Sequence, residues 1–161
     1  LDIISKTKKD IIELILVKYE NNIVFNRELF YLRDIVSDKN ITNIEKISIL
    51  SRSPYKGHEY LKDIFDQEVN IYLKDFINND YNSFFSKIIL PYINISPTSE
   101  NEVTSDLILK IKQIKLDIGN KNIENALKNL KTINEYENIF KLSSLEINKY
   151  LNFKMELYKL I

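Results

Sequence analysis

The sequence contains no cysteine and no tryptophan, and it has only 2 glycines and 3 prolines among 161 residues. Without cysteine, the chain can form no disulfide bond, no thiolate nucleophile and no cysteine-ligated zinc site. So few turn-forming residues argue against a β-sandwich or a β-barrel, because such folds need many tight turns. These absences favour long helices joined by polar loops.

A surplus of charge of one sign is also missing. The sequence has 23 basic and 23 acidic residues, so its formal net charge is +0. A non-specific nucleic-acid binder needs excess cations to displace phosphate counterions. We therefore expect no nucleic-acid partner.

No apolar run approaches the roughly 20 residues that a membrane-spanning helix needs. The longest candidate, residues 11–17, is interrupted by Glu13. The chain begins with Leu1 rather than methionine, and we interpret it as a fragment of a longer protein.

Apolar residues recur at the spacing of amphipathic helices over almost the whole chain. The pattern predicts an all-α fold: a single domain over residues 1–161, built as a helical bundle of about seven to nine helices with antiparallel hairpins. The expected helices cover residues 3–20, 26–36, 42–50, 58–77, 80–89, 99–118, 120–133, 136–140 and 143–161.

The stretch VFNRELFYL, residues 24–32, carries the signals of a helix start. Asn26 is a favoured N-cap, because its side chain can accept a hydrogen bond from a free amide of the first turn. Phe25 and Phe30 then occupy the two positions of a hydrophobic staple. We expect these three residues to have a structural role, with Phe25 in the core or in an interface.

Further signals mark other helix ends. Gly119 is placed to end a helix in the left-handed conformation, and Asn120 can cap the next helix, which predicts an antiparallel hairpin. Three pairs with the capping-box spacing predict helix starts. These pairs are Thr42 with Glu45, Ser99 with Glu102, and Ser143 with Glu146.

Residues suited to catalysis or metal binding are sparse. His58 is the only histidine, and beside Gly57 we expect it to be a surface loop residue. Metal sites usually need a second histidine or a tight carboxylate cluster. We predict a protein that is not an enzyme and has no cofactor, metal or small-molecule substrate. An enzyme whose site assembles from scattered carboxylates and tyrosines is the least favoured alternative.

The first expected helix has a basic start. Lys6, Lys8 and Lys9 lie next to an isoleucine-rich stripe, a pattern typical of helices that rest on anionic membranes. Asp10 and Glu13 dilute this basic character. The three lysines are therefore candidates for contact with a membrane surface, and ordinary core packing of the helix is the alternative.

The order of short motifs resembles the C-terminal region of the mitofilin family, in particular its alphaproteobacterial members. The pattern F-x-x-E-L-x-x-L starts at Phe25, and L-x-x-x-F joins Leu61 to Phe65. Gly119-Asn120 is then followed by an alanine- and leucine-containing helix. The resemblance covers about residues 10–133. The chain departs from the family where residues 21–23 replace an expected glycine.

The resemblance implies a membrane-organising scaffold, with this chain as the soluble C-terminal part of a protein anchored in the inner membrane. It implies a periplasmic or intermembrane-space-like location, self-association into a homo-oligomer or binding of a protein partner, and contact with an anionic membrane. The alternative is a helical adaptor or effector domain unrelated to mitofilin, and a cytoplasmic location.

Overall fold

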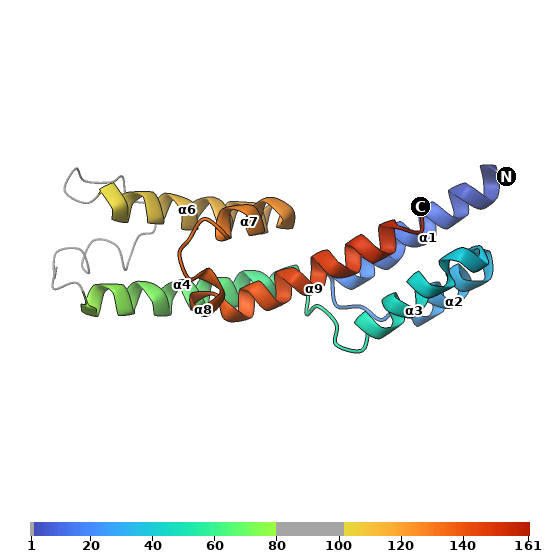
Figure 1. Ribbon diagram of the computed structural model, residues 1–161, viewed down its shortest axis with the longest axis horizontal. Helices are drawn as coiled ribbons and strands as arrows, with labels where there is room; N and C mark the ends of the chain where they lie inside the picture. The colour runs from blue at the N-terminus through green and yellow to red at the C-terminus, as the bar shows by residue number, and fades with distance from the viewer. Residues whose placement is uncertain (1, 80–101) are drawn as a thin grey trace. The chain divides into compact units, whose positions relative to one another are not determined.

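The computed structural model describes the backbone of residues 2–79 and 102–161 and the side chains of residues 3–74 and 106–161. Within these ranges the chain forms helices and no strand, so the all-α prediction is confirmed (Figure 1). The helix expected over residues 80–89 and the capping residue Ser99 lie outside the described residues. The helices are α1 (Asp2–Glu20), α2 (Asn26–Ile35), the 3-10 helix η1 (Asp38–Asn40), α3 (Ile41–Leu50), α4 (His58–Asn79), α6 (Glu102–Gly119), α7 (Ile123–Leu130), α8 (Tyr136–Ile139) and α9 (Lys141–Tyr158).

The chain divides into two compact units. Unit 1 comprises Leu1–Glu59 and Glu146–Ile161, so it holds α1, α2, α3 and most of α9. Unit 2 is Tyr60–Leu145, which holds most of α4 together with α6, α7, α8 and the first residues of α9.

An aromatic cluster forms the centre of unit 1. The ring of Phe153 on α9 stacks on Tyr19 of α1, with ring centroids 3.7 Å apart and planes 8° from parallel. Phe25 packs edge-on against both rings. Ile12 and Ile15 extend the same buried face of α1. The apolar spacing of the first helix therefore does direct one face into a core.

The helices α1 and α6 end in the same way. After α1, Asn22 has a left-handed φ of 55°, and Ile23 donates its N–H to the carbonyl of Lys18. After α6, Lys121 has a φ of 62°, and Asn122 donates its N–H to the carbonyl of Asp117. Both are Schellman motifs, which satisfy carbonyls that a helix end leaves free.

The predicted left-handed role of Gly119 is therefore wrong. Gly119 is the last helical residue of α6, and the left-handed position falls two residues later, at Lys121. The predicted cap shifts too: Asn122, rather than Asn120, caps α7 by accepting from the N–H of Asn125 at 3.3 Å. The hairpin stands, because the amides of Asn125 and Asn129 on α7 both donate to the buried carboxylate of Asp117 on α6.

The roles predicted for Asn26 and Phe30 at the start of α2 are also wrong. The N-cap is Phe25, whose carbonyl accepts from the N–H of Leu29 at 3.0 Å, and no side chain caps this end. Phe30 is 63% exposed, whereas Phe25 is 6% exposed and packs on Phe153, so the two rings form no staple. Phe25 is held by the aromatic core, where it packs on Tyr19 and Phe153, and not by a local staple. The expected burial of Phe25 is confirmed.

Two predicted capping boxes are not formed. Helix α3 begins at Ile41, directly after η1, which places Thr42 inside the helix and not at its cap. Helix α9 begins at Lys141, so Ser143 already lies in its first turn. In both places the helix starts earlier than the local pattern predicts.

Helix α4 supplies the cap that α9 needs, inside unit 2. One carboxylate oxygen of Glu68 accepts from the N–H of Ser143 at 2.8 Å and from its hydroxyl, and the other accepts from the N–H of Leu142 at 3.0 Å. Glu68 and Ser143 are buried. A single side chain thus satisfies two free amides and places a negative charge at the positive end of the helix.

In unit 2, aromatic side chains of α4 pack on Phe140, the residue that follows α8. Phe65 stacks on Phe140, with ring centroids 5.3 Å apart, and Tyr72 meets Phe140 edge-on. An ion pair of 2.9 Å between Lys115 and Asp66 links α6 to α4. The face of α4 that carries Phe65 and Tyr72 is therefore a packing surface of unit 2.

Candidate functional site

The amino-terminal turns of α1 carry exposed apolar and basic side chains together. Ile3 is 80% exposed and Ile4 56% exposed. Lys6 and Lys9 are exposed and Lys8 is half-buried. We call these five residues the α1 start. The structure thus places the three predicted membrane-contact lysines in the same turns of α1 as two largely exposed isoleucines.

The exposed apolar character continues along α1. Leu14 and Val17 are exposed. Leu14 lies eleven residues after Ile3, and Val17 lies three residues after Leu14, so the three side chains share one helix face. Ile12 and Ile15 point into the core from the other face. Helix α1 therefore has a buried apolar face and an exposed face on which Ile3, Leu14 and Val17 lie together with Asp10.

His58 is not the surface loop residue that the sequence predicts. It is the first residue of α4, it is 8% exposed, and its Nδ1 shares a hydrogen bond of 2.6 Å with the Tyr55 hydroxyl. Its Nε2 lies 3.7 Å from Oε1 of Glu20, which also accepts from the Tyr150 hydroxyl at 2.6 Å. The physical reason is the connector between α3 and α4, residues 51–57, which contains Pro54 and a left-handed Gly57 and turns Tyr55 and His58 inward.

These side chains, together with Tyr19, form a polar network that we call the Tyr55 cluster. The Tyr19 hydroxyl accepts from the N–H of Tyr55 at 3.1 Å and donates to the carbonyl of Lys149. A tyrosine, a histidine and a carboxylate in a row could relay a proton, but the side chains of Tyr19, Tyr55, His58 and Tyr150 are buried. We interpret the cluster as a support that joins α1, the connector and α9.

The cluster predicts a loss of stability at high pH. Burial raises the pKa of Tyr19 to about 12, and it raises the pKa of Tyr55 as well, with Glu146 and Glu20 acting in the same direction. An unfolded tyrosine has a pKa of about 10, so the folded state keeps protons that the unfolded state releases. The stabilisation is complete below about pH 10 and falls as the pH rises toward about 12.

Urea unfolding followed by circular dichroism at several pH values tests this prediction. The free energy of unfolding should fall less steeply with rising pH in a variant carrying Tyr19→Phe and Tyr55→Phe than in the wild type. This comparison separates the two tyrosines from the lysines that titrate in the same pH range. An equally steep fall of the unfolding free energy in both proteins would contradict the assignment.

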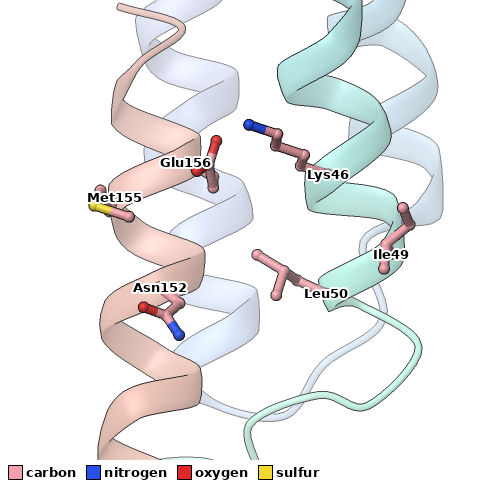
Figure 2. Close-up of a pocket in the computed structure, with 6 residues that line it drawn as sticks. All are labelled: Lys46, Ile49, Leu50, Asn152, Met155 and Glu156. Atoms are coloured by element: carbon pink, nitrogen blue, oxygen red, sulfur yellow. The ribbon is translucent and has the colours of Figure 1, made fainter.

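A groove with a volume of about 280 Å³ lies between α3 and α9 in unit 1. Figure 2 shows Lys46 of α3 pointing across it toward Glu156 of α9, and Leu50 of α3 pointing toward α9 between Glu156 and Asn152. The remaining lining residues are Ile49, Asn152 and Met155. Glu156 is already held, because it accepts from Asn43 and pairs with Lys159. The groove is thus largely apolar, with a lysine at its rim, and no residue of the Tyr55 cluster lines it.

The described residues contain no group of three or more histidine, cysteine or acidic side chains arranged to hold a metal ion. Among their helices, none combines the length and the apolar character that crossing a bilayer requires.

No protein-family model, no curated protein and no solved structure matches this chain significantly. The resemblance to the mitofilin family therefore stays a prediction that rests on the short motifs in the sequence.

Proposed function

We propose that this chain is a non-enzymatic, mitofilin-like scaffold domain that acts by self-association and by binding an anionic membrane surface. The observation that carries the membrane part is the α1 start, where exposed Ile3 and Ile4 lie beside Lys6, Lys8 and Lys9. Isoleucine side chains gain by leaving water for the acyl boundary, and lysines gain by approaching lipid phosphates. The proposed location is the periplasmic side of an inner membrane.

The test is co-sedimentation with vesicles of phosphatidylcholine that contain phosphatidylglycerol. Replacing Lys6, Lys8 and Lys9 by glutamate should weaken binding by about a hundredfold or more, since each basic residue near an anionic surface contributes about 1 kcal/mol. Circular dichroism of the variant should show unchanged helicity, because none of the three lysines is fully buried.

A matched control reverses three exposed lysines elsewhere, at positions 62, 128 and 131. This control has the same net charge as the first variant, so it separates a local contact from the bulk charge of the chain. Membrane binding through the α1 start requires the control to bind like the wild type. Equal losses in both variants would mean that the lysines of α1 have no special role.

A second candidate function is a helical adaptor domain, favoured by the groove between α3 and α9. An apolar groove that is flanked by two helices can accept one face of a partner helix. Ile49 and Met155 are exposed at this groove and would supply the apolar contact. Replacing Met155 by glutamate should abolish partner binding in this case and leave vesicle binding intact, as a pull-down and a co-sedimentation assay would show.

A further inference from the structure

Helix α2 presents an exposed stripe with an ordered chemistry. Arg27, Phe30, Tyr31 and Asp34 follow the spacing i, i+3, i+4 and i+7, which places them on one helix face, and all four are exposed. We call them the α2 stripe. The opposite face of α2 carries buried Leu32 and Glu28, which forms an ion pair with Lys18 of α1. That face therefore anchors α2 to α1.

The charged ends of the stripe have no ionic partner among the described residues. Arg27 lies over the Tyr31 ring, with its guanidinium carbon 5.6 Å from the centroid, and it forms no ion pair with a described carboxylate. Asp34 forms none with a described cation. Between these two charged residues, Phe30 is 63% exposed and meets the Tyr31 ring edge-on, with ring centroids 6.1 Å apart. Arginine, tyrosine and phenylalanine are enriched in the parts of protein interfaces that contribute most to binding.

The order of charges is self-complementary when two copies of the helix run antiparallel. A twofold axis between Phe30 and Tyr31 places Arg27 of each copy opposite Asp34 of the other copy. It also places Phe30 of each copy opposite Tyr31 of the other copy. A parallel arrangement would instead bring Arg27 next to its own copy. Antiparallel helix dipoles also attract each other.

We propose that the α2 stripe is the self-association surface of this protein, and that its partner is a second copy of the chain bound through an antiparallel α2–α2 contact. This inference rests on the self-association part of the proposed function and is independent of the membrane part. Helix α2 has 10 residues, so the contact is small and the dimer is expected to be transient. Concentration on a membrane surface would favour it.

Charge exchange provides the test, with sedimentation equilibrium as the readout. Arg27→Glu and Asp34→Arg should each raise the dissociation constant by about tenfold or more, because each creates two repulsive pairs. An equimolar mixture of the two variants should associate again, because both cross pairs become attractive. The double variant R27E/D34R should also associate. The control is Arg33→Glu, an exposed change of the same size on α2 but off the stripe.

Cross-linking tests the direction of the pairing. The chain has no cysteine, so a single introduced thiol reports on one position. Phe30→Cys should give a disulfide-linked dimer. Arg27→Cys should give much less, because the two copies of position 27 lie about 10 Å apart along antiparallel axes. Equal cross-linking at both positions would contradict the antiparallel arrangement.

The outcomes separate this inference from the function it rests on. Restored association in the mixture of single variants supports the α2 stripe. A dimer that is unaffected by Arg27→Glu and Asp34→Arg would overturn the stripe but leave self-association standing. A wild-type chain that is monomeric up to about 1 mM, the weak end of specific association, would overturn both.

Discussion

Replacing Phe153 with alanine is expected to lower the free energy of unfolding of unit 1 by about 3–5 kcal/mol. The ring is fully buried, and it contacts Tyr19 face-on and Phe25 edge-on, so truncation leaves a cavity that three elements must fill. Tyr19 and Tyr55 are tied into the Tyr55 cluster by hydrogen bonds, which limits how far these tyrosines can move into the space. Urea unfolding followed by far-ultraviolet circular dichroism measures the change.

The chain offers a matched control in Phe30→Ala, the same substitution at a position that is 63% exposed. This control should change stability by no more than about 0.5 kcal/mol. The comparison is made at protein concentrations where the chain is monomeric, so that loss of an α2 contact does not enter. A Phe153→Ala protein as stable as this control would show that the aromatic centre of unit 1 is wrongly placed.

Replacing Glu68 with alanine is expected to destabilise unit 2 by about 2–4 kcal/mol. The change removes the acceptor of two backbone amides and one hydroxyl at the start of α9, where no water can easily replace it. Glu68→Gln keeps one oxygen acceptor but turns an amide donor toward the other contacts, so its cost should be smaller. Amide hydrogen exchange at Leu142 and Ser143 should accelerate in both variants.

The neighbouring, exposed Gln67→Ala serves as the control on the same helix, and it should leave exchange at Leu142 and Ser143 unchanged. If Glu68→Ala also left these two amides fully protected, another group would have to cap α9, and the role assigned to Glu68 would be wrong.

The apolar spacing in the sequence was sufficient to predict the helices. Leu61, Phe65 and Val69 recur every four residues and are buried along α4, and α1 ends at Glu20, where the first expected helix also ends. These features depend on neighbours within one or two turns. Hydrophobic periodicity reports directly which face of a helix leaves water, so it transfers reliably from sequence to structure.

The helix ends were harder to predict, because distant residues decide them. Ser143 and Glu146 match a local capping box, yet Ser143 binds Glu68, which lies 75 residues away in the sequence. Glu146 instead accepts from the N–H of Lys56, 90 residues away. Local patterns carry no information about such contacts. Heavy use of asparagine adds to the difficulty, since several asparagines near α6 and α7 are equally suited to a cap.

His58 and the α2 stripe show the same limit for functional sites. A single histidine beside a glycine is usually exposed, and only the fold places His58 against Tyr55 and Tyr150. The spacing of Arg27, Phe30 and Asp34 is visible in the sequence, but the staple interpretation pairs Phe30 with Phe25. Once Phe30 is known to be exposed, the charge order around it becomes a candidate surface.

We propose that the outward faces of α1 and α2 carry the function, whereas the buried polar groups support the fold. A salt titration of binding to phosphatidylglycerol-containing vesicles tests its membrane part most directly. Binding is expected at low salt and should be largely lost near about 1 M salt, where the Debye length falls to about 3 Å. Absence of binding at low salt, or binding that persists unchanged at high salt, would contradict it.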